Sequence, residues 1–416
     1  MTKSRFLKME RIAPVSNATM VPDIETVDFS RSSPLSMREQ QKRARARGVH
    51  WDEGLGGWLV ASFDNVRRVM SNPGRFASEG TPVAEAFGAQ AMLVVDSPMH
   101  HKLRAAWADQ MSAVGVENVA ERIQDYIDQT FEPCFEALNR GEAVDLVSAF
   151  WRLTSRVISD LMNVPYESAG QFIELHYLLA DNAVVPFEPT SPKFIERAEA
   201  KEAVFQFLRP LVQQRRAALA RGEQLTDMIS MMAATQGTNG ITEQVVVDNL
   251  LNLYLGAFET TALWMGNITI RLYEDENLRE LLRSDSSLIP AALEEMMRID
   301  TVVQLNMRVV RVDTELDGVQ LKAGDSIFVM QGAANQDPAA YEDPERFDIN
   351  RTGKPHLGFG FGFHQCIGQF LARLEARLYV KHILANIPAL TFEEKYFGTD
   401  WMVDGPKRLI VRKAVA

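Results

Sequence analysis

The sequence has little cysteine: only Cys134 and Cys366 occur among its 416 residues. A lone disulfide bond is not expected in a cytoplasmic protein of this size. Structural zinc sites and iron–sulfur clusters are not expected either, because neither cysteine belongs to a Cys-x-x-Cys pair. Cys134 lies within a helical pattern, and we expect it in the core. The chemistry of Cys366 is what needs an explanation.

The sequence also lacks a long hydrophobic run. No stretch of about 18 uninterrupted apolar residues occurs, so no segment is expected to span a membrane. Residues 1–14 mix Lys, Arg and Glu and lack the apolar core of a signal peptide. We therefore expect a cytoplasmic protein.

Positive charge is scarce. The 44 Lys and Arg residues are outnumbered by 55 Asp and Glu residues, which gives a formal net charge of −11. A surface of this sign repels phosphate backbones, so nucleic acid is not expected as a partner. No linker, charge block or repeat divides the chain, and a hydrophobic content of 46% is enough for a large core. We expect residues 1–416 to form a single domain.

Hydrophobic spacing predicts a mainly α fold with a smaller β portion. The expected long helices are 116–138, 142–163, 193–221, 241–273 and 367–386. The expected strands are 58–61, 308–312, 326–330 and 409–411, so the β-rich parts lie near 49–62 and 308–332. Segment 182–192 carries three prolines between two helices and is expected to be a mobile connection.

Residues 359–368 form a glycine-rich loop, Phe-Gly-Phe-Gly-Phe-His-Gln-Cys-Ile-Gly. Its glycines permit backbone conformations that side chains would block, so peptide N–H groups can approach a sulfur. Apolar residues at helical spacing follow from Ile367, which places Cys366 at a helix N-terminus. The dipole and free N–H groups there favour a thiolate, and a thiolate is a good ligand for a soft metal.

This loop resembles the haem-binding loop of the cytochromes P-450, whose pattern is Phe-Gly-x-Gly-x-His-x-Cys-x-Gly. Every defined position matches, from Phe359 through His364 and Cys366 to Gly368, and the resemblance runs from about residue 51 to 406. It implies the P-450 fold, in which a helical bundle with small sheets surrounds a haem b cofactor. It also implies that these four residues bind the cofactor, with Cys366 as the iron ligand. The other reading is a glycine-rich turn around a buried cysteine.

A second motif, Gly256-Ala257-Phe258-Glu259-Thr260, interrupts a long apolar helix. An acid and a threonine are costly to bury there, and the Thr260 hydroxyl can donate to the carbonyl of Gly256. The motif resembles the oxygen-binding stretch of the family, which implies that Thr260 hydrogen-bonds dioxygen and that Glu259 helps to relay protons. Ala257 stands where the family pattern has Gly, a departure that bears on the width of the oxygen groove. The alternative is a polar pair that only bends the helix.

Two further sets of residues fit the resemblance. Glu295 and Arg298 are three apart on one helix face and can pair. The family's Glu-x-x-Arg pair implies that they hold the irregular segment ahead of the haem loop, which is a structural role. His100 and Arg104 share a helix face, and Arg308 falls where the family has another arginine. The resemblance implies that these three bind the haem propionates; taken singly, each would be read as a surface charge.

By analogy, the substrate pocket lies between loop 77–95, the helix that carries Thr260, segment 303–306 and the chain end. The residues expected to line it are Asn252, Leu255, Phe258, Val303, Gln304 and Trp401, with Met402 beside them. Most are apolar, which favours a hydrophobic substrate. Asn252 and Gln304 either hydrogen-bond a substrate oxygen or bond only to backbone and water. Segment 182–192 is either a lid over the pocket or a plain surface loop.

The resemblance implies a monooxygenase that inserts one atom of dioxygen into a small-to-medium hydrophobic organic substrate, by hydroxylation or oxidative dealkylation. Electrons would come ultimately from NAD(P)H through a separate ferredoxin or flavin protein that docks near the Cys366 loop. Two rival readings remain open. A haem-thiolate peroxygenase or isomerase would share the loop, but it would not need Glu259 and Thr260. A haem-binding protein would bind its ligand without turnover.

Overall fold

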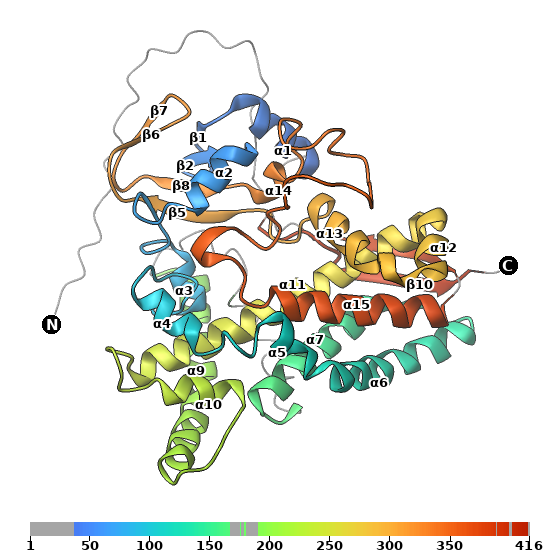
Figure 1. Cartoon of the computed structure of the whole chain (residues 1–416), viewed down its shortest axis with the longest axis horizontal. Coiled ribbons are helices and arrows are strands. Elements are labelled where there is room, and N and C mark those ends of the chain that lie inside the picture. Colours follow the sequence, from blue (N-terminus) through green and yellow to red (C-terminus); the bar gives the residue numbers. More distant parts are fainter. Residues whose placement is uncertain are drawn as a thin grey trace.

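The computed structural model describes residues 37–166, 175, 179, 190–387, 389–398 and 402–414. Long helices make up the larger part of the molecule, and a sheet with short helices makes up the smaller part (Figure 1). This is the mainly α fold with a smaller β portion that the sequence predicts. None of the helices in the described part of the chain is long and apolar enough to cross a membrane.

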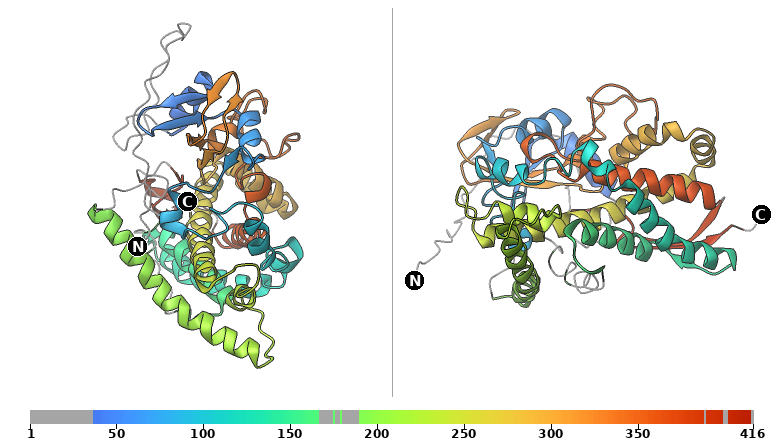
Figure 2. Two further views of the ribbon diagram at one scale, coloured as in Figure 1. Left: turned by 90° about the vertical axis from the view of Figure 1, so that its left-hand side faces the viewer. Right: turned by 60° about the horizontal axis from the view of Figure 1, so that its bottom comes forward.

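The larger part is organised around one long helix. The long helices are α6 (Ala120–Asn139), α7 (Leu146–Met162), α9 (Pro192–Ala220), α11 (Glu243–Glu274) and α15 (Gln369–Asn386). Helix α11 packs against α7, α9 and α15, and most of its side chains are buried. Figure 2 shows α9 along the outer edge of this part. Helix α11 therefore passes through the centre of the core.

Shorter helices lie in both parts (Figure 1). They are α1 (Met37–Arg47), α2 (Phe63–Met70), α3 (Val83–Phe87), α4 (Met99–Ala105), α5 (Ala113–Glu117), α10 (Met228–Ala234), α12 (Glu276–Ser284), α13 (Ile289–Ile299) and α14 (Gln331–Ala334), with 3-10 turns at Ser286–Leu288 and Gly362–His364.

The strands form three small sheets. The largest has the order β1 (His50–Asp52), β2 (Gly57–Val60), β8 (Ser326–Val329), β5 (Asn306–Val310) and β3 (Phe76–Ala77). Its β2–β8 pair is parallel, and its other pairs are antiparallel. The second sheet joins β4 (Val144–Asp145), β10 (Arg408–Lys413) and β9 (Leu390–Tyr396), and the third is the hairpin β6 (Thr314–Leu316) with β7 (Val319–Leu321).

Most predicted elements are present, and the differences lie at their ends. The predicted helix 116–138 is divided, because α5 ends at Glu117 and α6 begins at Ala120. The predicted helix 142–163 begins as strand β4, and α7 starts only after Asp145, whose side chain accepts the N–H of Val147 as an N-cap. Cys134 is buried in α6, as expected. Of segment 182–192, only residues 190–192 are among those described.

Glu295 and Arg298 form a buried ion pair on α13. The Arg298 guanidinium donates two hydrogen bonds to the Glu295 carboxylate, of 2.7 and 2.8 Å. It also donates to the carbonyls of Asn335 and Pro344, both over 2.8 Å. Glu295 in turn accepts a 2.9 Å bond from Arg351. This geometry supports the predicted structural role, because the pair fastens the irregular segment 335–355 to α13.

We expect Arg298→Ala to lower the free energy of unfolding by about 3–5 kcal/mol, because it leaves the Glu295 carboxylate buried without its main partner. Urea unfolding followed by circular dichroism measures the change. Arg140→Ala is the matched control: it breaks the Arg140–Glu142 pair, whose side chains are more than half exposed, and should leave stability almost unchanged. Equal effects of the two substitutions would contradict the structural role.

Candidate active site

The Cys366 loop is closed by its own backbone. The N–H of Cys366 donates to the carbonyl of Phe359 over 2.8 Å. Gly360 and Gly362 have φ of +72° and +75°, in the left-handed region that favours glycine. A Cβ on Gly362 would lie only 2.8 Å from the carbonyl oxygen of Met70. The loop therefore requires glycine at these positions, as predicted.

Opposing effects act on the Cys366 thiol, which lies just before α15. Burial raises its pKa, and this effect is larger than the lowering by the Gly368 N–H, which donates to the sulfur, and by the charges of Arg104 and Arg373. A metal cation bound to the sulfur would act in the same direction as these lowering effects, because coordination deprotonates a thiol.

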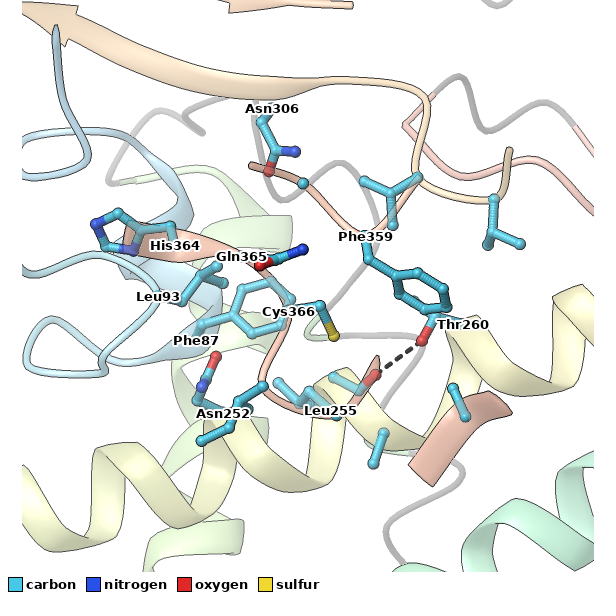
Figure 3. Close-up of a pocket in the computed structure, with 18 of the residues that line it drawn as sticks. Phe87, Leu93, Asn252, Leu255, Thr260, Asn306, Phe359, His364, Gln365 and Cys366 are labelled. Carbon is cyan, nitrogen blue, oxygen red and sulfur yellow. Dashed lines mark hydrogen bonds between the residues drawn. The ribbon is translucent and has the colours of Figure 1, made fainter. Parts of the chain in front are cut away.

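A cavity of about 310 Å³ separates the loop from α11. Figure 3 shows the sulfur of Cys366 beside this space, with Asn252, Leu255 and Thr260 on α11 and Asn306 across from them. Other wall residues include Phe87, Leu93, Trp107, Val303 and Met402. Most of the wall is apolar. Asn252, Leu255 and Val303 therefore lie where the sequence predicts pocket residues.

Two predicted pocket residues lie elsewhere. Phe258 is completely buried, and its ring packs against Trp151 and Tyr254 at centroid distances of 4.3 and 5.7 Å. It faces the core because it lies on the side of α11 that packs against α7. The prediction that Phe258 lines the pocket is wrong.

The Gln304 side chain is held by protein groups. Its Nε2 donates to the carbonyl of Thr301, and its Oε1 accepts from the side chain of Gln41. Gln304 does not line the cavity. It bonds to one backbone carbonyl and to one side chain, so neither alternative, a substrate oxygen or backbone and water alone, describes it. Trp401, also predicted to line the pocket, lies outside the described residues.

Thr260 faces the cavity, and its hydroxyl is held by the helix. The hydroxyl donates to the carbonyl of Gly256 over 2.8 Å, as predicted (Figure 3). Gly256 and Ala257 also line the cavity, and a Cβ on Gly256 would meet nothing within 4 Å. Helix α11 therefore leaves free space beside Gly256, and the oriented hydroxyl of Thr260 lies next to that space.

Glu259 is in contact with a residue that the sequence did not suggest. Its carboxylate accepts a 2.6 Å hydrogen bond from the ammonium of Lys407, and both side chains are largely buried. Lys407 directly precedes β10 and lies 148 residues away in sequence, so no local pattern could reveal the pair. The acid of the motif therefore has a cationic partner from the C-terminal hairpin.

One end of the cavity is basic. Arg308 is buried, which lowers its pKa to about 10, and its guanidinium donates to the adjacent carbonyl of Met307 over 2.6 Å. Arg104 donates to the carbonyl of Gln365. His100 is buried with no partner for Nδ1 among the described residues. Buried cations need anions nearby, so this end fits the two carboxylates of a haem better than an apolar ligand.

His364 has a carboxylate partner of its own. Its Nε2 lies 3.1 Å from Oδ1 of Asp96, and Asp96 also accepts hydrogen bonds from Arg311 and from the N–H of Ser78. Burial alone would raise the pKa of Asp96, but the hydrogen bonds from His364 and Arg311 outweigh it and lower the pKa to about 2. The Asp96 carboxylate thereby connects the Cys366 loop to the start of α4. The sequence did not suggest Arg311.

The side chains around the cavity are suited to haem and not to a metal ion that is held by protein groups alone. No cluster of three or more His, Cys, Asp or Glu side chains suited to a metal ion occurs among the described residues. One sulfur, an apolar cavity of suitable position and a buried basic end are the features that an iron porphyrin needs. The residues present therefore fit the cofactor that the loop implies.

Comparisons with known proteins give the same result. The family model described as Cytochrome P450 matches residues 58–395. The chain is 31% identical over 390 residues to cytochrome P450 monooxygenase PikC of Streptomyces venezuelae, covering 89% of each protein. It is 29% identical to 20-oxo-5-O-mycaminosyltylactone 23-monooxygenase of Streptomyces fradiae, covering 87% of this chain and 85% of that protein.

Solved structures are similar over nearly the whole chain. The crystal structure of CalO2 superimposes with a TM-score of 0.81 at 25% identity, covering 94% of this chain and 99% of that one. A mutant of P450 EryK in complex with erythromycin B gives a TM-score of 0.79 at 26% identity, covering 90% and 95%.

We expect Cys366→Ser to abolish the red-shifted absorption band of the reduced carbon monoxide complex, because that band requires a thiolate ligand. Absorption spectra of reduced protein with and without carbon monoxide measure it. Cys134→Ser is the control and should keep the band, since Cys134 is buried in α6. Persistence of the band in Cys366→Ser would mean that another residue is the axial ligand.

Proposed function

Because the chain belongs to the cytochrome P450 family, we propose that Cys366 binds the haem iron and that substrate is oxidised in the cavity beside it. The chain is a haem-thiolate monooxygenase, an oxidoreductase that inserts one atom of dioxygen into a hydrophobic organic molecule. The observation that carries the residue assignment is the sulfur of Cys366 in the wall of an apolar cavity with one basic end.

The cofactor supplies the redox chemistry, since a thiolate ligand donates electron density that favours cleavage of the O–O bond. The protein holds and orients the cofactor. Arg308, Arg104 and His100 are proposed to bind the two propionates. The charge of each arginine is then neutralised, and the Nδ1 of His100 gains a partner.

Thr260 is proposed to position dioxygen and the water that delivers protons to it. Its hydroxyl hydrogen is directed to Gly256, so the hydroxyl oxygen is left as an acceptor on the cavity side. Glu259 directly precedes Thr260 on α11, but its carboxylate is hydrogen-bonded to Lys407. Glu259 is therefore proposed to exchange protons with the cavity only when the contact with Lys407 opens.

The substrate is proposed to bind against the apolar wall between α3 and α11. Asn252 contributes an amide to this wall (Figure 3), and one well-placed polar group is enough to orient an apolar ligand. Asn252 is proposed to hydrogen-bond an oxygen of the substrate. Hydroxylation and oxidative dealkylation both fit such a site, and a panel of compounds screened for a haem spin-state shift would identify the substrate.

Electrons are proposed to come from NAD(P)H through a small ferredoxin or flavin protein that docks over the Cys366 loop. Phe363 in the loop and Phe370 at the start of α15 are 44% and 39% exposed. The adjoining α5 presents Val114, which is 80% exposed. Exposed apolar side chains beside the sulfur ligand suit a transient contact.

We expect Phe370→Ser to slow reduction by the donor protein, because it removes apolar contact area from the docking face. Stopped-flow absorption measures the rate, and reduction by dithionite should be unchanged because it needs no docking. Tyr396→Ser is the matched control: Tyr396 is a 53% exposed aromatic residue on β9, outside the proposed face. Equal slowing by both substitutions would place the donor elsewhere.

We expect Thr260→Ala to divert most of the consumed reducing equivalents into hydrogen peroxide, because the substitution removes the hydroxyl that positions the proton-delivering water. Product, peroxide and NAD(P)H consumption are measured together with a surrogate redox chain. Thr260→Ser keeps the hydroxyl and should retain most of the coupling. Unchanged coupling in Thr260→Ala would remove Thr260 from the proton path.

Absence of any product from the unaltered protein across the panel of compounds would favour the alternative of a haem protein that binds its ligand without turnover.

A further inference from the structure

Two amide side chains are hydrogen-bonded to each other in the wall of the cavity. The Nδ2 of Asn306 on β5 donates to the Oε1 of Gln331, the first residue of α14, over 2.6 Å. Both residues line the cavity, and Asn306 lies across it from α11 (Figure 3). The pair is therefore a polar site in a wall that is otherwise mostly apolar.

The hydrogen bond between the two amides leaves part of each amide unused. Among the described residues, the Oδ1 of Asn306 and the Nε2 of Gln331 make no hydrogen bond. Gln331 is only 1% exposed, so the cavity is where its amide can meet a further partner. Either orientation of the two linked amides leaves one N–H donor and one carbonyl acceptor for such a partner.

The backbone on both sides of the pair is fixed. Asn306 is paired with Val329 in the β5–β8 ladder. The N–H of Gly332 donates to the carbonyl of Gln304 over 3.1 Å, and a Cβ on Gly332 would overlap the Gln304 side chain, so this close approach requires glycine. The two amides are therefore preorganised, and a ligand that binds them has little further ordering to impose.

The acidic and arginine side chains of the described wall already have other roles. Arg104 and Arg308 lie at the basic end and are proposed to bind the propionates. Glu259 forms an ion pair with Lys407. Burial raises the pKa of Glu375 well above its usual value, which favours the uncharged form. A carboxylate or ammonium on a substrate would therefore be buried without an opposite charge, which is costly.

The open carbonyl of the pair distinguishes further between neutral groups. It repels an anion, and it gives no hydrogen bond to a ketone or an ether, because those groups only accept. A hydroxyl can accept a hydrogen bond from the amide N–H and donate one to the amide carbonyl at the same time. A hydroxyl therefore uses both parts of the pair.

We propose that Asn306 and Gln331 together form a specificity-determining site that binds a hydroxyl group of the substrate, and that the substrate is an uncharged alcohol with an apolar body. This inference rests on the proposed function, which places the substrate in this cavity. It deepens that function by naming the chemical class of the substrate and the two residues that select it.

Cyclic compounds that share a ring and differ in their polar group test the proposal. Cyclohexanol, cyclooctanol and cyclododecanol are each compared with the parent hydrocarbon, the methyl ether and the ring carboxylate, through the spin-state shift of the ferric haem-loaded protein. At least one alcohol should bind about tenfold more tightly than its hydrocarbon, as expected for neutral hydrogen bonds. The ether should lie between them, and the carboxylate should bind at least about a hundredfold more weakly than the alcohol.

Substitutions of similar size identify the residues responsible. Asn306→Leu and Gln331→Met each remove one amide, and each should reduce the advantage of the alcohol over its hydrocarbon to about twofold or less. The double variant should lose no more than either single variant, because the two amides act as a unit. Asn306→Thr restores a hydroxyl and should recover part of the advantage. The reduced carbon monoxide band and unfolding midpoints verify that each variant folds and holds haem.

An alcohol advantage that persists in both Asn306→Leu and Gln331→Met would overturn the proposal. Its loss only in Asn252→Leu would place the hydroxyl on the opposite wall and would count equally against the pair. Faster transfer of haem from Asn306→Leu to apomyoglobin, with an unchanged alcohol advantage, would mean that the pair binds a propionate instead.

The proposed function fails in a different way from this inference. Spin-state shifts with the hydrocarbons but no tighter binding of the alcohols would refute the hydroxyl site and leave the cavity as the substrate site. Absence of a shift with every compound would contradict the cavity itself as the place where substrate binds, and the inference with it.

Discussion

The hydrogen bond from the amide of Cys366 to the carbonyl of Phe359 fixes the place of the sulfur, and most of the site is arranged in relation to it. It closes a loop in which Gly362 packs too tightly against the end of α2 for any side chain. The sulfur is left at the edge of an apolar cavity, where burial makes ionisation unfavourable. A bound metal cation reverses that balance, so the same burial that disfavours a free thiolate favours a strongly held ligand.

The charges around the cavity follow the same logic. The chain carries a net charge of −11, yet Arg104 and Arg308 lie together in the wall. Burial makes cations there costly unless anions are present. The Asp96 carboxylate, near the start of α4, supplies part of the negative charge and also contacts His364. The haem propionates are proposed to supply the remaining negative charge. Binding of the cofactor and the placement of these arginines therefore depend on each other.

The sequence allowed the helices and the loop to be predicted because both leave local signals. Hydrophobic spacing placed α9, α11 and α15 within a few residues of their ends, and the glycine pattern identified Cys366.

Contacts between distant segments leave no such signal. Lys407 reaches Glu259 across 148 residues, and Gln41 holds Gln304 from α1. Phe258 was misplaced because an aromatic residue on a helix buried on all sides suits the core and a pocket equally well.

The wall of the haem cavity is assembled from residues as far apart as Phe87 and Met402. Such a site exists only when the whole chain has folded, so the cofactor discriminates almost completely between native and denatured protein. By thermodynamic linkage, a ligand with that preference raises the free energy of unfolding by RT ln(1 + L/Kd), where L is its free concentration and Kd its dissociation constant. The free haem concentration thus affects the fraction of molecules that is folded and thereby protected from proteolysis.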